Sequence, residues 1–247
     1  MSEELIIGKN AVIEALKSGR SVNKVLISKQ LNSSMQGKLM QLGKNAGTVV
    51  QKVPKNKLDQ LSAKNHQGVI AYVASYAYAS LDDLFDAAEQ KGEAPFFIIL
   101  DGLEDPHNLG SILRTADAAG AHGVIIPKHR SVGLTQAVAK TAAGAIEYVP
   151  VARVTNIANT IDALKERNVW IVGTESDATE DYRRLDGTMP IAVIIGNEGK
   201  GISRLVQKKC DWTVSLPMKG KVSSLNASVA CSLLLYEIYR KRHPAGE

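Results

Sequence analysis

Polar side chains that could bind a ligand or take part in a reaction occur in three segments. Each segment directly follows an apolar run of the kind that forms a strand. The first segment spans residues 101–117 and contains Asp105-Pro106, Asn108 and Arg114. Asp-Pro favours a turn, and Asn108 can cap a helix whose second turn carries Arg114. An asparagine and an arginine near the carboxyl end of a strand can recognise phosphate or ribose. The alternative is a capped helix with a surface arginine.

The second segment is a glycine-rich turn, residues 196–201, which follows the apolar run 191–195. Glycines in such a turn let the backbone approach a ligand closely. The spacing GxxGxG differs from the dinucleotide fingerprint GxGxxG, and no acid stands about twenty residues further on. A carboxylate in the turn, Glu198, would repel a pyrophosphate. The turn therefore favours a neutral or positive ligand, such as a sulfonium.

The third segment, residues 216–228, contains Ser224 and Asn226 and leads into an apolar helix. Either polar residue could simply cap that helix. The helix itself, residues 229–239, is apolar on more than one face and ends in Arg-Lys-Arg, which indicates burial against a sheet or a partner chain.

Several other kinds of site are excluded by the same residues. The chain has no P-loop, no nucleophile elbow with a serine–histidine–acid set, and no group at metal-ligand spacing. The two cysteines, Cys210 and Cys231, lack a CxxC pattern and are expected to be buried small hydrophobes. The titratable bases near the three segments are Glu198 and His107.

The polar segments need a sheet to bring them together, and the pattern of the chain from residue 96 onward predicts one. Apolar strands without polar alternation, separated by helices, are typical of a parallel sheet covered on both faces, which binds ligands at the carboxyl ends of its strands. The expected strands are residues 96–101, 123–126, 148–151, 169–173, 191–195 and 213–216. Residues 1–75 form a separate α/β module, and residues 76–94 are expected to be a linker.

Composition and charge limit the partners. The 247 residues, 45% hydrophobic and 22% charged, are typical of a globular protein. Residues 1–75 carry eleven Lys and Arg against four acids, a charge of +7, whereas the remainder carries −2. This asymmetry indicates either an arm that binds a polyanion or a lysine-rich soluble surface. We find no signal-peptide or membrane-spanning pattern, so the expected location is the cytoplasm.

At these residues the sequence resembles the SpoU/TrmH branch of the SPOUT methyltransferases. Three motifs carry the resemblance: DPxNxGxxxRTAdAxG at residues 105–120, GNEGxGI at residues 196–202 and LPMxGxVxSLNxSVA at residues 216–230. The N-terminal module is similar to the substrate-binding domain of the family, with GxNAVxEAL at residues 8–16 and HQGVIA at residues 66–71. The combination is most similar to the bacterial enzymes that methylate a guanosine ribose in large-subunit (23S) rRNA.

The resemblance implies an architecture and a cofactor. It implies an RNA-binding domain of the L30e-like α/β type at residues 1–75, a linker at residues 76–94, and an α/β parallel-sheet SPOUT domain with a deep trefoil knot at residues 95–247. It also implies S-adenosylmethionine as the methyl donor, no metal, and a homodimer formed through the SPOUT domain. The residues that match the cofactor pocket of the family are Gly173, Thr174, Gly196, Asn197, Gly199, Leu216, Met218, Ser224, Leu225 and Asn226.

The implied reaction is in-line transfer of the sulfonium methyl group to a ribose 2′-OH of RNA. Arg114 matches the candidate base of the family, assisted by Asn108, Glu198, Ser224 and Asn226. A second role for Arg114 is to grip the phosphate of the target nucleotide and lower the pKa of the hydroxyl electrostatically, since a guanidinium has no acceptor. His107 fills a variable position of the motif and is given no chemical role.

The motifs are also compatible with other RNA substrates and with a non-catalytic function. The same catalytic motifs would serve a tRNA ribose methyltransferase or an antibiotic-resistance rRNA methyltransferase, and a non-catalytic ribosome-assembly factor could share the fold. The N-terminal module has a single aromatic residue, Tyr72, which argues for reading the shape and backbone of folded RNA over base stacking. Seven lysines of this module are expected to contact RNA phosphates: Lys9, Lys24, Lys44, Lys52, Lys55, Lys57 and Lys64. For each of them the alternative is an ordinary solvated lysine on the surface.

Overall fold

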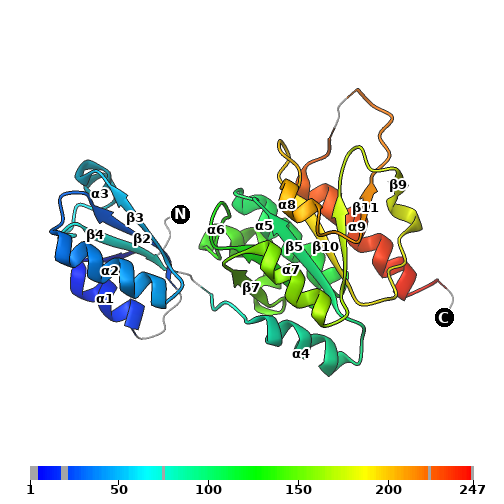
Figure 1. Ribbon diagram of the computed structural model, residues 1–247, viewed down its shortest axis with the longest axis horizontal. Coiled ribbons are helices and arrows are strands. Elements are labelled where there is room, and N and C mark those ends of the chain that lie inside the picture. The colour runs from blue at the N-terminus through cyan, green and yellow to red at the C-terminus, as the bar shows by residue number, and fades with distance from the viewer. Residues whose placement is uncertain (1–4, 18–21, 74–75, 222–223, 246–247) are drawn as a thin grey trace. The chain divides into compact units, whose positions relative to one another are not determined.

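The computed structural model describes residues 5–17, 22–73, 76–221 and 224–245 (Figure 1). The chain divides into two compact units. The first comprises residues 1–77 and 133–136, and the second comprises residues 78–132 and 137–247. None of the helices in the described ranges has the length and apolar content that crossing a bilayer requires.

The first unit is a four-stranded sheet with helices on both faces. Its strands lie in the order β1-β4-β2-β3, with β2 and β3 parallel and the other pairs antiparallel. The strands are β1 (Leu5–Ile7), β2 (Val22–Ser28), β3 (Val49–Val53) and β4 (Val69–Val73). The helices are α1 (Lys9–Lys17), α2 (Ser33–Asn45) and α3 (Lys55–Leu61).

Side-chain alternation divides the core of this unit into two layers. Val25 and Ile27 of β2 pack with α1 and α2, whereas Leu26 between them packs with Leu58 of α3. Residues i and i+2 of a strand share a face, so Lys24 lies on the α3 side of the sheet with Leu26. The short helix α3 therefore covers the sheet face that carries Lys24.

The second unit contains the predicted parallel sheet, with seven strands in the order β7-β6-β5-β10-β8-β11-β9 and every neighbouring pair parallel. Its strands are β5 (Phe96–Asp101), β6 (Gly123–Pro127), β7 (Val151–Val154), β8 (Trp170–Thr174), β9 (Glu180–Asp181), β10 (Ile191–Gly196) and β11 (Trp212–Ser215). The strand expected at residues 148–151 begins only at Val151, because a 3-10 turn, η1 (Ala145–Glu147), precedes it and leaves Tyr148 77% exposed.

Helices cover both faces of this sheet, as a buried parallel sheet requires. One face packs its core against α4 (Leu81–Lys91), α7 (Ile157–Glu166) and α8 (Arg204–Gln207). On the other side α5 (Pro106–Ala118) packs against α9 (Ala227–Arg242), and Thr115 and Ser232 share a hydrogen bond of 3.1 Å between them. The remaining helical segments are α6 (Gln136–Ala142) and the 3-10 turn η2 (Tyr182–Arg184).

The segment expected to be a linker, residues 76–94, contains α4. Ser80 and Asp83 form a reciprocal capping box at its start, and Leu84 and Ala88 are buried. Leu84 fills the space that a side chain at Gly123 would need. The segment thus contributes to the core of the second unit.

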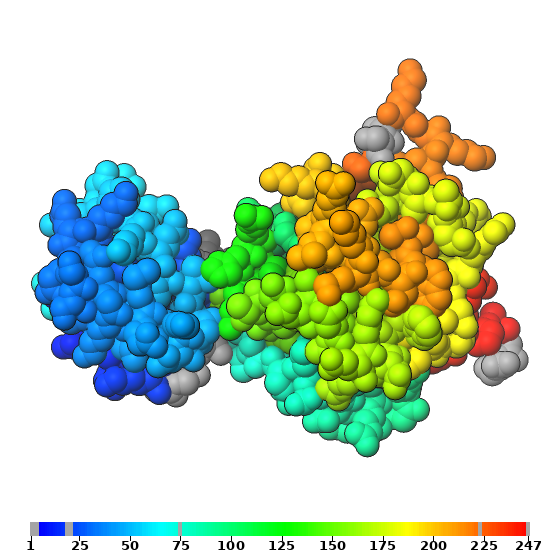
Figure 2. Space-filling view, viewed as in Figure 1, coloured from blue at the N-terminus to red at the C-terminus, as the bar shows by residue number. Residues whose placement is uncertain are grey.

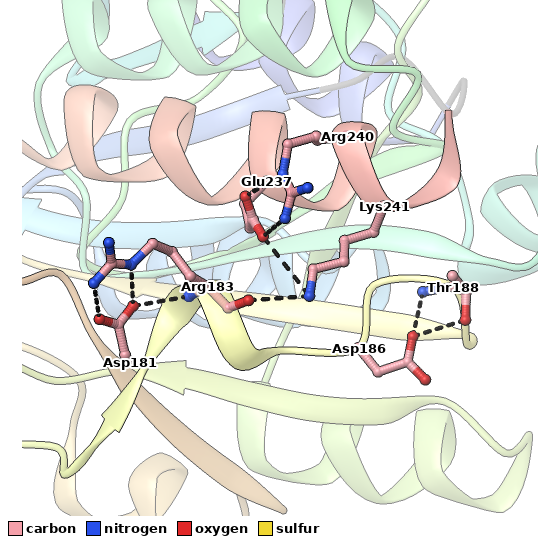
Figure 3. Close-up of polar contacts among 7 residues, drawn as sticks. All are labelled: Asp181, Arg183, Asp186, Thr188, Glu237, Arg240 and Lys241. Carbon is pink, nitrogen blue, oxygen red and sulfur yellow. Dashed lines mark hydrogen bonds and ion pairs between the residues drawn. The ribbon is translucent and has the colours of Figure 1, made fainter. Parts of the chain in front are cut away.

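The C-terminal end of α9 is fixed by its basic side chains. Arg242 is half-buried and donates hydrogen bonds to the carbonyl groups of Ala94, Pro95, Gly187 and Met189, at 2.6–3.3 Å. Burial lowers the pKa of Arg242. Beside it, Lys241 bonds the carbonyl group of Arg183, and Glu237 pairs with Arg240 (Figure 3). These contacts join the last turns of α9 to the segment around η2.

A buried histidine makes the stability of the second unit depend on pH. His122 is 1% exposed; its Nδ1 accepts the Phe96 N–H at 3.1 Å, so its Nε2–H donates to Glu93 at 3.0 Å. Burial lowers the pKa of His122, and the bond to Glu93 opposes this only in part. Below the ordinary histidine pKa of about 6.5, the unfolded chain therefore binds more protons than the folded chain.

We expect the free energy of unfolding to fall as pH drops from about 6.5 toward the lowered pKa of His122, and this contribution to be constant above that window. Urea unfolding at pH 7.5, 6.5 and 5.5 measures it, with His122→Gln as the non-titrating variant and His129→Gln, at an exposed position, as the control. The gap between wild type and His122→Gln should shrink toward acid pH. Parallel profiles of the two proteins would contradict this account.

Candidate active site

The three polar segments meet where the direction of the chain connections reverses in the sheet. The strands β5 and β10 are parallel neighbours, with Gly196 opposite Asp101, yet the chain continues from β5 toward β6 and from β10 toward the other edge. Such a switch point opens a crevice at the carboxyl ends of the strands. Asn197 bridges it by donating from Nδ2 to the carbonyl group of Gly102 at 3.2 Å.

The glycine-rich turn is closed on itself. The backbones of Asn197 and Gly201 exchange hydrogen bonds of 3.1 and 2.7 Å, and the Asn197 side chain accepts the Gly199 N–H at 3.0 Å. Gly201 adopts a φ of +64°, which favours glycine. A Cβ at Gly196 would overlap the backbone of Gly201 and Ile202. The glycine at position 196 is thus required by the closeness of two backbone segments.

Glu198 is the centre of a network that joins all three segments. Its Oε1 accepts hydrogen bonds from the side-chain amide of Asn108 at 2.6 Å and from that of Asn226 at 3.1 Å, and the Ala227 N–H lies at 3.4 Å. The Asn226 amide also donates to Asn108 Oδ1 at 3.0 Å, while its own Oδ1 caps α9. Asn108 is 5% exposed. The network fixes the position of a carboxylate at the switch point.

Beside this network lies a cavity of about 420 Å³, within the size range of small-molecule sites. It is lined by the residues after β8, by the glycine-rich turn, by the end of β11 and by the approach to α9. One rim, residues 216–221, stands out from the body of the unit (orange in Figure 2). The lining residues are Thr174, Glu175, Ser176, Ile195, Gly196, Asn197, Glu198, Gly199, Lys200, Gly201, Val214, Leu216, Met218, Ser224, Leu225, Ala227 and Ala230.

Most of the residues predicted to bind the cofactor line this cavity. They are Thr174, Gly196, Asn197, Gly199, Leu216, Met218, Ser224 and Leu225. Gly173 does not: it lies inside β8, where a Cβ would come within 2.8 Å of Cys210 Sγ and 3.2 Å of Ile202 Cδ1, so packing explains the glycine. Asn226 also lies outside the lining and contacts Glu198.

Sequence reasoning missed Glu175, which lies in the cavity wall directly after β8. One of its carboxylate oxygens, Oε1, is buried and accepts no hydrogen bond from any residue that the structure describes. The sequence could have indicated it by its position, because Glu175 is the second residue after the strand predicted at residues 169–173. Polar residues at that place face the ligand edge of the sheet.

Arg114 is the predicted catalytic residue that lies outside both the Asn108–Glu198–Asn226 network and the cavity. It is exposed on α5, six residues or about 9 Å along the helix axis from Asn108. It makes no ion pair with any residue in the described ranges. His107 is exposed on the same helix, where its ring lies 3.3 Å from Thr141 Oγ1.

The seven predicted RNA-contacting lysines do not form one patch. Lys55 and Lys57 lie exposed on α3, Lys24 is half-buried on the sheet face that α3 covers, and Lys52 and Lys64 flank that helix in the sequence. Lys9 and Lys44 lie on α1 and α2, which cover the opposite face of the sheet. Lys52 also lies on this opposite face, because it is two residues from Val50 and pairs with Ile27. Three of the seven, Lys24, Lys55 and Lys57, therefore share the α3 side of the sheet.

The cavity wall fits S-adenosylmethionine by its chemistry. Its two carboxylates, Glu175 and Glu198, complement a cationic ligand, and the orphaned oxygen of Glu175 requires a hydrogen-bond donor. Apolar side chains such as Leu216 and Leu225 suit an aromatic base. Over the residues that the structure describes, no cluster of histidine, cysteine and acidic side chains could hold a metal ion.

Comparison with known proteins decides the family. A model described as the SpoU rRNA Methylase family matches residues 95–236, more than half of the chain. The chain belongs to this family. A second model, described as RNA 2′-O ribose methyltransferase substrate binding, matches residues 5–79 of this SpoU methyltransferase. The predicted class, an S-adenosylmethionine-dependent RNA 2′-O-ribose methyltransferase with an N-terminal substrate-binding domain, is confirmed.

Individual relatives agree with the family. The SpoU chain is 59% identical over 244 residues to the putative TrmH family tRNA/rRNA methyltransferase YacO of Bacillus subtilis, covering 99% of this chain and 98% of that protein. It is 52% identical over 247 residues to a putative TrmH family tRNA/rRNA methyltransferase of Staphylococcus aureus, covering both chains fully. The solved SpoU methyltransferase AviRb of Streptomyces viridochromogenes, in complex with the cofactor AdoMet, superposes with a TM-score of 0.62 at 28% identity, over 97% of this chain and 90% of that one.

Proposed function

We propose that this enzyme transfers the methyl group of S-adenosylmethionine to the ribose 2′-OH of a guanosine in 23S rRNA. The observation that carries the chemistry is the Asn108–Glu198–Asn226 network beside the cavity at the sheet's switch point. The choice of rRNA rests on the resemblance of the full motif set and on the family description. The expected location is the cytoplasm, where such RNA is made.

The chain's own residues would align the reaction. Bound S-adenosylmethionine supplies an activated methyl group, so the protein must mainly position the partners and deal with one hydroxyl proton. Three donors hold Glu198 Oε1, which keeps the carboxylate at a fixed place in the cavity wall. Ser224, also in the wall, offers a hydroxyl that can contact the target ribose.

Arg114 would act on the RNA. An exposed guanidinium suits a bidentate phosphate contact, and its charge would favour the developing alkoxide of the 2′-OH. The alternative, direct proton abstraction by Arg114, needs an acceptor that a protonated guanidinium lacks. The electrostatic role is therefore the one we assign.

The first unit would hold the RNA through the lysines around α3. Lys55→Ala/Lys57→Ala should weaken binding of rRNA fragments several-fold and reduce the slope of log K against log salt by about one for each lost phosphate contact. Filter binding over a salt series measures this. Lys38→Ala, an exposed lysine on α2, is the matched control. Unchanged affinity and slope in the double variant would remove these lysines from the RNA surface.

A second copy of the chain would cover the outer face of α9. Val229, Leu233 and Tyr236 are 48, 42 and 50% exposed, although Cys231, Leu234 and Leu235 already bury the inner face. An apolar stripe of this kind typically marks an interface. Because α5 packs on α9, exposed residues of α5 such as Arg114 would lie near that interface.

Leu233→Glu should therefore convert a dimer into monomers. Sedimentation equilibrium at micromolar concentration measures the mass, and Leu205→Glu, at a 59% exposed position on α8, is the matched control that should stay dimeric. A wild-type protein that sediments as a monomer would contradict the dimer.

The trefoil knot and the domain boundaries at residues 75 and 95 stay predictions.

The substrate class is tested by offering the enzyme separate RNA fractions. Purified protein with labelled S-adenosylmethionine should methylate 23S rRNA lacking its own modifications and leave tRNA unlabelled. Reverse-transcription stops at limiting nucleotide concentration would then locate one guanosine. Labelling confined to tRNA would favour the tRNA ribose methyltransferase, which the names of the relatives also allow.

A further inference from the structure

Glu175 has no part in aligning the methyl transfer, yet it lies in the cofactor cavity and one of its oxygens lacks a hydrogen-bond donor. It is the first residue after β8, and its neighbours Thr174 and Ser176 line the same cavity. Its backbone N–H donates to the carbonyl group of Val214 at 3.0 Å, which extends the pairing of β8 with β11. The backbone that carries this side chain is therefore held firmly by the sheet.

The carboxylate of Glu175 is only partly stabilised by the protein itself. The backbone N–H of Ile202, at the end of the glycine-rich turn, acts to lower its pKa. Its Oε1 is buried and has no partner in the described part of the chain. Buried polar atoms in folded proteins are paired in the great majority of cases, and an unpaired one destabilises the fold. A ligand that donates a hydrogen bond to Oε1 would remove this cost.

The charges around Glu175 point the same way. Burial raises the pKa of Glu175, and the nearby Asp177 raises it further, while the Ile202 N–H acts in the opposite direction. A second carboxylate, Glu198, lies in the same cavity wall. Among the described lining residues, these two carboxylates outnumber the one cationic side chain, Lys200, so the wall favours a ligand that brings N–H or O–H donors or positive charge.

We propose that Glu175 is a cofactor-recognition residue that accepts, at Oε1, a hydrogen bond from an N–H or O–H group of S-adenosylmethionine. The inference rests on the cofactor named under the proposed function. Glutamate is required because a carboxylate presents an acceptor to the ligand with either of its two oxygens, while the Ile202 N–H favours its charged form. Glutamine has only one oxygen, and its amide nitrogen donates instead of accepting.

Isothermal titration calorimetry on the full-length protein tests this with Glu175→Gln. A hydrogen bond to a charged group is worth about 1.5–3 kcal/mol, so the variant should bind S-adenosylmethionine about ten- to a hundredfold more weakly. Asp177→Asn removes the same charge two residues away, at an exposed position outside the cavity, and should bind within twofold of wild type. Wild-type affinity in Glu175→Gln would overturn the proposal.

A second readout separates recognition from a structural role. Without cofactor, Glu175→Gln should unfold at the same temperature as wild type or higher, because no internal partner of Oε1 is lost. A lower unfolding temperature of the free variant, large enough to account for the weaker binding, would assign Glu175 to the structure of the turn and overturn its recognition role.

A third measurement identifies the donor. 5′-Methylthioadenosine lacks the amino-acid part of the cofactor. If Glu175→Gln weakens its binding as much as that of S-adenosylmethionine, the donor belongs to the nucleoside. If its binding is unchanged while that of S-adenosylmethionine falls, the donor is the amino group of the methionine part. A wild-type protein that binds neither compound would instead refute the cofactor assignment itself.

Discussion

Gly196→Ala should abolish measurable cofactor binding. The added methyl group would overlap the backbone carbon of Gly201 and the backbone nitrogen of Ile202, and neither can move without opening the turn. Asn197, next to the substitution, bridges to Gly102 and would be displaced with the turn. We expect affinity for S-adenosylmethionine to fall by more than about a hundredfold, with a loss of about 1–3 kcal/mol in the free energy of unfolding. Calorimetry and urea unfolding measure the two effects.

Gly199→Ala is the matched control within the same turn. The nearest atom to its added methyl group is Asn197 Oδ1 at 3.6 Å, an ordinary contact, and its φ is not in the left-handed region. Affinity should stay within a few-fold of wild type. Equal behaviour of the two variants would mean that the close approach at Gly196 does not shape the cavity.

Arg114→Ala should lower kcat about a hundredfold or more while leaving the affinity for S-adenosylmethionine unchanged. The side chain is exposed on α5, outside the residues that line the cavity, so its loss cannot disturb the cofactor directly. Removing one group that stabilises developing charge commonly costs a factor of this size. Single-turnover methylation of RNA and calorimetry give the two values. A near-normal kcat would remove Arg114 from the mechanism.

Two comparisons refine the role of Arg114. Arg184→Ala, at an exposed arginine on η2, should behave as wild type. The pH dependence of the residual rate of Arg114→Ala separates the two mechanisms. A slope unchanged from wild type supports the electrostatic role, and a lost titration step would support proton abstraction.

The parallel sheet was predictable because its strands are continuous apolar runs, and β5 and β10 lie where the sequence places them. The meeting of Asn108, Glu198 and Asn226 followed from the same reasoning, since each comes soon after a strand and the carboxyl ends of parallel strands share an edge. The family comparison confirms the enzyme class that the motifs predicted.

Other features could not be predicted from the sequence and are visible only in the structure. The segment that forms α4 was interpreted as part of a linker although residues 81–88 are amphipathic, and only the structure shows that Leu84, Leu81 and Phe85 pack against the core of the sheet. Gly173 was expected in the cofactor pocket from the family resemblance, but only the structure shows that Cys210 and Ile202 occupy the space of its missing side chain. The orphaned oxygen of Glu175 depends on the burial of one atom, which no spacing of residues encodes.

The chemical position of the transferred methyl group tests the proposed reaction most directly. RNA labelled by the enzyme from tritiated S-adenosylmethionine is hydrolysed in alkali, which cleaves after every nucleotide with a free 2′-OH. The label is expected in alkali-resistant dinucleotides, because a methylated 2′-oxygen cannot attack the neighbouring phosphate. Label in mononucleotides would show base methylation, and no transfer to any RNA would show that this cavity does not perform the proposed reaction.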